Sequence, residues 1–147
     1  MSSTFHSLHF HVVFSTKERR PFIRPAWRER LHEYLGGTVR GLGGVAEAVG
    51  GVEDHVHLLI SAPTTLAPAT LLRDLKRASS VWVAQNHGPG FAWQEGYAIF
   101  SVSTTHCAAV RRYIANQEAH HSAIPFTGEL VRLLNRNQIE YDPRYLL

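Results

Sequence analysis

The sequence has almost no cysteine and no long apolar run. Its single cysteine, Cys107, excludes an internal disulfide framework and a zinc site built from several thiolates. Any metal ion is therefore expected to be held by nitrogen and oxygen ligands. No run of about eighteen apolar residues occurs, and the opening segment "MSSTFHSLHF" shows no secretory signal. We therefore expect a cytoplasmic protein with no membrane partner.

The rest of the composition is that of a globular protein with a mildly basic charge. The chain has 147 residues, of which 44% are apolar, and we expect residues 1–147 to form a single domain. The formal net charge is +3, and thirteen of the fifteen basic residues are arginine, whose planar guanidinium suits phosphate. Charge alone favours a nucleic-acid partner only weakly, because arginine use also follows genome composition.

Hydrophobic periodicity predicts an α+β fold of the ferredoxin-like βαββαβ type. The expected elements are a strand over 7–17, a helix over 24–44, paired strands over 45–54 and 55–62, a helix over 65–86 and a strand over 96–103. Helices over 103–121 and 127–139 form an appended C-terminal segment. We expect an antiparallel sheet with helices on one face, which leaves the other face free for a partner.

The stretch "GGVEDHVHLLIS", residues 50–61, places two histidines in a strand that is otherwise apolar. His55 and His57 are two residues apart, so their side chains leave the strand on the same side and can both reach one ion. The alternative is a pair of hydrogen-bonded histidines on a polar sheet face. His9 and His11 repeat the arrangement on the first strand, so this spacing by itself does not identify a metal site.

The predicted helix over 103–121 offers a third ligand and a nucleophile. Tyr113 and Gln117 are four residues apart and are therefore neighbours on one helical face. Two imidazoles with one amide oxygen leave open positions that suit Mg²⁺ or Mn²⁺ bound to a substrate phosphate. The alternative for Tyr113 is a half-buried ring with its hydroxyl at the surface.

Several segments together resemble a known family over nearly the whole chain. They are "FHVVFSTKERRPF", "EDHVHLLIS", "LLRDLKRASS", "FAWQEGYAIFSVS" and "YIANQEAHH". In this order they resemble the single-tyrosine HUH transposases of small bacterial and archaeal insertion sequences. The related repeat-associated tyrosine transposases share these boxes, but "HVVFSTKERRPF" is more similar to the mobile-element branch.

The resemblance implies an enzyme that cleaves and rejoins single-stranded DNA through a 5′-phosphotyrosine. His55 and His57 would hold Mg²⁺ or Mn²⁺, Gln117 would complete the site, and Tyr113 would be the nucleophile. It also implies a homodimer on DNA hairpins and no small-molecule cofactor. In some relatives the tyrosine helix completes the partner's active site, so action within one chain or between two stays open. His120 is a candidate for the general base.

Basic and aromatic side chains are the candidates for gripping DNA. We expect two basic patches, whose members are Lys17, Arg19, Arg20, Arg73, Lys76 and Arg77. A solvated helix face is the alternative for the patch on the second helix. Phe91, Trp93 and Tyr97 could stack on bases, or they could anchor their loop to the core.

Two other function classes remain open from the sequence. One is an inactive or domesticated relative that binds single-stranded DNA hairpins without cutting them. The intact set of His55, His57, Tyr113 and Gln117 favours activity over this alternative. The other is a metal-binding ferredoxin-like protein unrelated to DNA.

Overall fold

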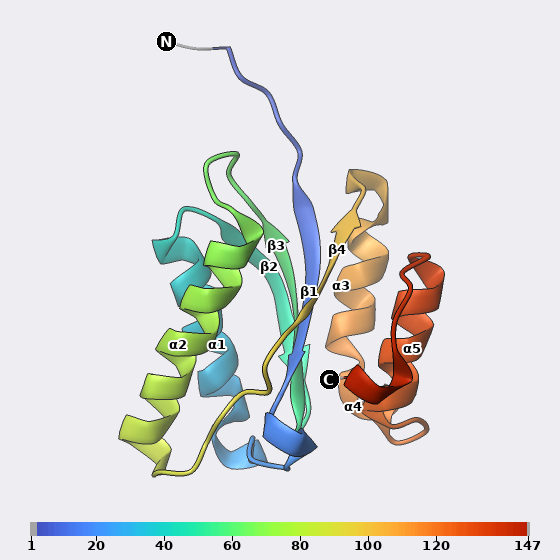
Figure 1. Cartoon of the computed structure of the whole chain (residues 1–147). Helices are drawn as coiled ribbons and strands as arrows, with labels where there is room; N and C mark the ends of the chain where they lie inside the picture. Colours follow the sequence, from blue (N-terminus) through green and yellow to red (C-terminus); the bar gives the residue numbers. More distant parts are fainter. Residues whose placement is uncertain (1–2, 147) are drawn as a thin grey trace.

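The computed structural model describes residues 3–146, in which four antiparallel strands form one sheet between two layers of helices (Figure 1). The order across the sheet is β2-β3-β1-β4, and every neighbouring pair is antiparallel. The strands are β1 His9–Ser15, β2 Val45–Gly51, β3 His55–Ser61 and β4 Ala98–Val102. This architecture confirms the predicted α+β class and the predicted order of elements.

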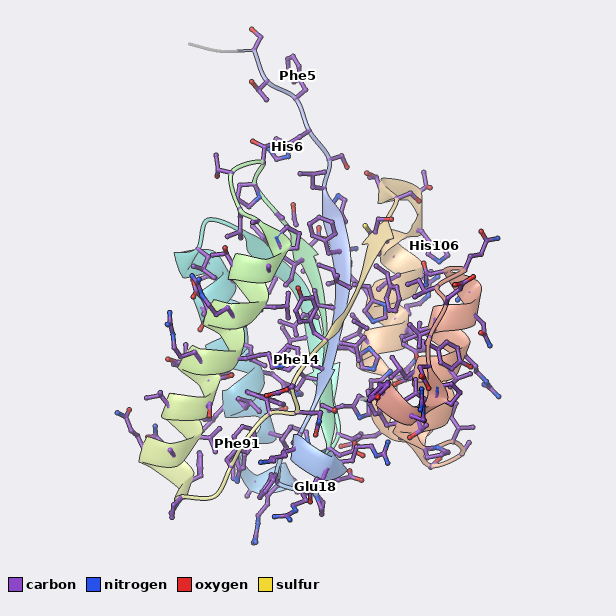
Figure 2. The ribbon with its side chains drawn as sticks, in the orientation of Figure 1. Phe5, His6, Phe14, Glu18, Phe91 and His106 are labelled. Atoms are coloured by element: carbon purple, nitrogen blue, oxygen red, sulfur yellow. The ribbon has the colours of Figure 1, made fainter. Side chains whose placement is uncertain are left out.

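Two helices cover one face of the sheet. They are α1, Pro25–Gly41, and α2, Pro68–His87, and each has a proline in its first turn, where the missing N–H leaves no bond unmade. The apolar side chains on α1 that the sequence predicted as its buried stripe are all buried: Trp27, Leu31, Leu35 and Val39. The core on this side also contains Phe14 from β1, and Figure 2 shows Phe14 and Phe91 toward the α2 layer.

The C-terminal helices cover the opposite face. They are α3 Cys107–Ala115, α4 Gln117–His121 and α5 Phe126–Arg136, and Figure 1 shows them across the sheet from α1 and α2. Phe126, Leu130 and Leu134 of α5 pack against Val13 and Phe100 of the sheet. The face that we expected to be free for a partner is therefore covered, because the appended segment is amphipathic enough to bury it.

Strand alternation explains why the two faces differ in chemistry. In β1 and β3, Val12 and Leu58 point toward the layer of α1 and α2, whereas Val13 and Leu59 point toward α3 and α5. His57 lies opposite Val13 in the register of the two strands and so faces α3 and α5. The predicted histidine pair thus faces the C-terminal helices.

The predicted helix over 103–121 is divided into three pieces. A short 3₁₀ turn over Thr104–His106 precedes α3, and the chain leaves helical geometry at Asn116, with φ −99° and ψ 22°, before α4 begins. Two further 3₁₀ turns occur at Lys17–Arg19 and Pro143–Tyr145. Among the described residues, none of the helices combines the length and apolar character needed to cross a membrane.

Candidate active site

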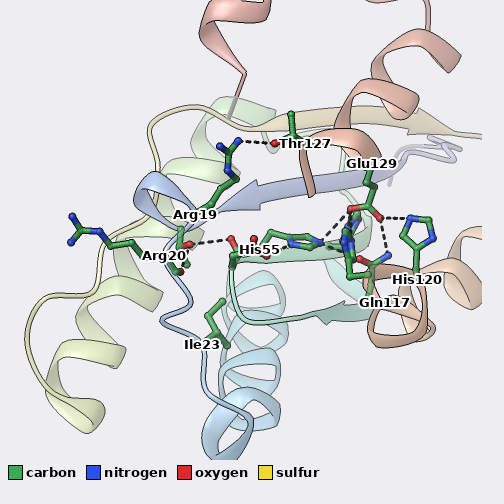
Figure 3. A network of polar contacts seen from close by, with 12 residues as sticks. Arg19, Arg20, Ile23, His55, Gln117, His120, Thr127 and Glu129 are labelled. Carbon is green, nitrogen blue, oxygen red and sulfur yellow. Dashed lines mark hydrogen bonds and ion pairs between the residues drawn. The ribbon is translucent and has the colours of Figure 1, made fainter. Parts of the chain in front are cut away.

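His55 and His57 are fully buried, and both point at the carboxylate of Glu129 on α5. The Nε2 atom of His57 lies 2.9 Å from Glu129 Oε1, and that of His55 lies 3.3 Å from the same oxygen. His121 of α4 approaches this oxygen with its own Nε2 at 3.0 Å. Three imidazole nitrogens therefore converge on one oxygen atom. Figure 3 shows Glu129 and His55 of this cluster, with Glu129 reaching from its helix toward the sheet.

Gln117, which the resemblance implied as the third ligand, contacts His55. Its Oε1 atom lies 3.2 Å from His55 Nε2, and its Nε2 atom donates to Glu129 Oε2 at 3.2 Å. Gln117 begins α4 rather than continuing the helix of Tyr113, but its side-chain amide also contacts the Tyr113 carbonyl at 3.4 Å. The break at Asn116 thus keeps the two predicted residues together.

Tyr113 joins the same cluster through its hydroxyl group. The hydroxyl donates to Glu129 Oε2, and the ring lies edge-on to His57 with the centroids 5.6 Å apart. Burial and the neighbouring carboxylate of Glu129 raise the pKa of Tyr113 well above its usual range. The phenol is therefore protonated in this arrangement, with its proton directed at Glu129.

Glu129 is the member of this cluster that the sequence analysis missed. It is 1% exposed, yet it lies on the apolar stripe of α5 beside Phe126 and Leu130. Burial alone would raise the pKa of Glu129, but hydrogen bonds from His121, His55 and His57 lower it well below its usual range. The sequence did contain a signal for this residue, a glutamate at helical spacing within an apolar stripe. Such a glutamate indicates a buried ion pair or metal site, because an ionised carboxylate is buried only where it has hydrogen-bonding or charged partners.

Two further polar groups contact the two strand histidines at their Nδ1 atoms, on the side of each ring away from Glu129. His55 Nδ1 lies 2.7 Å from Asp54 Oδ1, and His57 Nδ1 lies 2.8 Å from His11 Nε2. Although burial lowers the pKa of His55, the hydrogen bonds to Asp54 and Glu129 raise it to about 9. Burial lowers the pKa of His57 to about 4 and that of His11, which also faces His57, to about 3. His11 is thus a structural partner of the histidine box.

The donor set fits a divalent ion. His55, His57, His121 and Glu129 each offer one ligand atom, and these atoms lie within 4.8 Å of one another. The bond from His55 Nδ1 to Asp54 leaves Nε2 as the atom for a metal, which is the usual way in which a carboxylate orients a histidine ligand. A set rich in imidazole with one carboxylate suits Mn²⁺ or a later transition metal better than Mg²⁺.

The candidate for the general base, His120, borders the cluster. Its Nε2 atom lies 3.3 Å from Glu129 Oε2, and its ring lies edge-on to that of Tyr113. The proton of Tyr113 is directed at Glu129 rather than at His120.

The predicted DNA-binding residues occupy two separate places. Lys17, Arg19 and Arg20 lie in and after the turn that follows β1, where Arg19 donates to Thr127 of α5 at 2.8 Å (Figure 3). Arg73 and Arg77 are paired with Asp74 on α2, across the sheet from the histidine cluster.

Lys76 and two aromatic side chains serve the packing of the loop before β4. The ammonium group of Lys76 donates to the carbonyls of Gln94 and Gly96 at 2.7 and 2.8 Å. Phe91 and Trp93 pack against the core, which agrees with the alternative that they anchor their loop. Tyr97, by contrast, is 37% exposed. Of the three rings, Tyr97 is thus the one that offers an open face.

Comparison with known proteins places this arrangement in a family. The model of a family described as "Transposase IS200 like" matches residues 4–117. The chain belongs to the IS200-like transposase family. The match includes the histidine box and Tyr113 and ends at Gln117, so Glu129 and His121 lie beyond it. Family membership argues against the alternative of a ferredoxin-like metal protein unrelated to DNA.

Solved structures share the fold. A proposed transposase from Deinococcus radiodurans is 25% identical, with a TM-score of 0.61, over 80% of this chain and 95% of that one. A REP-associated tyrosine transposase bound to a REP hairpin is 14% identical, with a TM-score of 0.62, over 84% of this chain and 76% of that one. No curated protein matches the sequence.

Proposed function

We propose that this transposase cleaves and rejoins single-stranded DNA, with Tyr113 as the nucleophile and His55, His57 and Gln117 as ligands of a divalent ion. One observation carries the proposal: the Tyr113 hydroxyl meets the buried histidine pair and Gln117 around a single carboxylate. In a member of a transposase family, this is the set of groups that a phosphotyrosine mechanism needs.

The chemical step exchanges one phosphodiester bond for another. The Tyr113 oxygen attacks the scissile phosphorus, the bond from phosphorus to the 3′ oxygen breaks, and that oxygen leaves as a 3′-hydroxyl after taking up a proton. The phenolic proton departs toward Glu129 Oε2, which already accepts its hydrogen bond. One phosphoester bond forms for each one that breaks. A 3′-hydroxyl can therefore reverse the step, and no nucleotide cofactor is consumed.

A divalent ion, Mn²⁺ or Mg²⁺, when bound here, supplies positive charge that polarises the scissile phosphate. His55 and His57 would hold it through Nε2, with Gln117 and Glu129 contributing oxygen atoms. Asp54 and His11 fix the two imidazole rings in place. The chain's own contribution is therefore a preformed ligand set whose orientation does not depend on substrate.

The substrate that we propose is single-stranded DNA with a hairpin, bound by a homodimer. The solved relative bound to a REP hairpin supports the hairpin, and the basic turn around Arg19 lies beside α5 and the cluster. With both faces of the sheet covered, pairing would use a sheet edge, and β2 and β4 are the two edge strands among the described residues.

The substrate proposal is tested by competition. Hairpin-bearing single strands should outcompete duplex DNA of the same sequence, and binding should weaken steeply with salt because phosphate contacts release counterions. Equal affinity for the two competitors would remove the proposed preference for single strands.

The decisive test of the chemistry is a denaturing gel. Labelled single-stranded DNA from the ends of the insertion sequence is incubated with the protein, with and without Mn²⁺. Wild type should give a covalent protein–DNA band, Tyr113→Phe none, and the matched control Tyr97→Phe an undiminished one. His57→Ala should also lose the band, with a measurable loss of Mn²⁺ affinity that Tyr113→Phe does not show. An adduct that persists in Tyr113→Phe would assign the nucleophile elsewhere.

A second candidate function is a hairpin-binding protein that does not cut. It is favoured by the engagement of Tyr113, His55 and His57 with Glu129, a glutamate that is 1% exposed and that occupies the position between the hydroxyl group and the imidazoles. The same gel separates the two functions: hairpin binding without an adduct at saturating Mn²⁺ would establish the binding protein.

A further inference from the structure

A second cluster of metal-binding side chains lies at the other end of the same sheet face. His9 begins β1, Glu47 lies in β2, and Cys107 is the first residue of α3. One ligand atom from each lies within 4.8 Å of the others, and His9 Nδ1 is 3.0 Å from Glu47 Oε2. Figure 2 labels His106, just before Cys107, at the end of the molecule where β1 begins.

A β-bulge brings Glu47 into this cluster. Ala46 pairs with Ile60 and Ala48 pairs with Leu59, so the register shifts by one residue between them. Ala46 consequently packs toward α1 and α2, whereas Ala48 packs toward α3. Glu47 is the extra residue, and a bulge of this kind redirects a side chain. Here the carboxylate crosses β3 and reaches His9 on the far side.

The three side chains are largely buried, but two of them keep some contact with solvent. The side chains of His9 and Glu47 are 13% and 19% exposed, and Cys107 is 4% exposed. The Cys107 thiol makes one weak hydrogen bond, in which Sγ donates to the Ser103 carbonyl at 3.5 Å. Arg111 lies 3.6 Å from Glu47, but its side chain is 48% exposed and can turn into solvent. A small ion could therefore enter and still keep one open coordination position.

The ligand chemistry differs from that of the active site. A thiolate, an imidazole and a carboxylate are typical Zn²⁺ ligands, and three protein ligands with an open fourth position are a familiar zinc arrangement. The thiol of Cys107 would release its proton to solvent on binding, and the charges of thiolate and carboxylate would balance the ion. The expectation of nitrogen and oxygen ligands alone overlooked this mixed set.

We propose that His9, Glu47 and Cys107 form a second metal site, selective for Zn²⁺ or a similar borderline-soft ion. The site joins the start of α3, the helix that carries Tyr113, to β1 and β2. An ion here would pin the tyrosine helix to the sheet of its own chain. This proposal is independent of the catalytic one, since it concerns other residues and another class of ion.

Cobalt titration of the full-length protein tests the site. Cys107 is the chain's one cysteine, so a thiolate-to-cobalt charge-transfer band can arise only here. We expect the band in wild type and its loss when Zn²⁺ displaces Co²⁺; because the active site can also take up Co²⁺, saturation should need no more than two equivalents. His57→Ala, which removes an active-site ligand, should keep the band, whereas Cys107→Ser should abolish it.

The two other ligands are tested by His9→Ala and Glu47→Gln. Each should weaken Co²⁺ binding at this band by at least tenfold, because loss of a residue behind a ligand already costs about 10–100-fold. If wild type shows no band, that result alone overturns the proposal. Unchanged affinity in both variants would also overturn it, because the thiol would then bind cobalt unaided.

Discussion

Glu129 places one negative charge among three imidazoles in the protein interior, where its side chain is 1% exposed. Its Oε1 atom lies 2.9 to 3.3 Å from the Nε2 atoms of His57, His121 and His55. A buried carboxylate held by this many donors occupies the point on which metal ligands converge. With an ion present, the same oxygen could become a ligand after a small movement. We therefore expect this one residue to satisfy the histidines before metal binding and to contribute to the site afterwards.

Glu129→Gln tests this double role. The change keeps the size of the side chain and removes its charge, so we expect Mn²⁺ affinity to fall about 10–100-fold, as measured by calorimetry. Glu140→Gln, an exposed glutamate outside the cluster, is the matched control and should leave the affinity unchanged. Equal Mn²⁺ binding by wild type and Glu129→Gln would show that the carboxylate is not a ligand.

Gly50 allows the end of α3 to rest on the sheet. A Cβ atom at this position would overlap the carbonyl oxygen of Ile114, one residue after Tyr113. We expect Gly50→Ala to lower the free energy of unfolding by about 1–3 kcal/mol, as overpacking usually does. Urea denaturation measures the change. Gly37→Ala on α1 is the control, since its Cβ would contact nothing and should be neutral or stabilising.

At the scale of elements, α5 both covers the sheet and supplies the carboxylate around which the site is built. It buries Phe126, Leu130 and Leu134 on the sheet, and it supplies Glu129 from the same stripe. Arg19 ties its first turn to the basic turn after β1. Because the Tyr113 hydroxyl and the two strand histidines meet at a side chain of α5, a movement of this helix would change the whole arrangement.

Leu130→Ala should loosen α5 selectively. The substitution removes a side chain that is 2% exposed, and such losses lower unfolding free energy by about 2–5 kcal/mol. Hydrogen exchange should accelerate more in α5 than in α2, which packs on the other face of the sheet. Leu133→Ala, at a half-buried position of the same helix, should have the smaller effect. Equal acceleration in α2 and α5 would indicate global rather than local opening.

At the scale of the molecule, the sequence predicted what depends on local patterns. The βαββαβ order followed from periodicity, and the shared side of His55 and His57 followed from strand alternation. Neither pattern reveals which helix packs on which face, so the sequence could mark Glu129 as a glutamate within an apolar stripe but could not place it against the histidine box. The break at Asn116 was also missed, because helical spacing continues through it.

The arrangement of Tyr113 beside its own histidines makes a prediction about subunits. In this chain Tyr113 and His57 belong to one site, with ring centroids 5.6 Å apart. We therefore expect no cleavage when Tyr113→Phe and His57→Ala proteins are unfolded together, refolded as a mixture and given labelled single-stranded DNA. If the tyrosine helix instead served a partner, mixed dimers would regain one complete site, and the covalent band would reappear. The control is wild type taken through the same refolding, which must give the band. Adduct in the mixture above the level of either variant alone would assign the helix to the partner subunit.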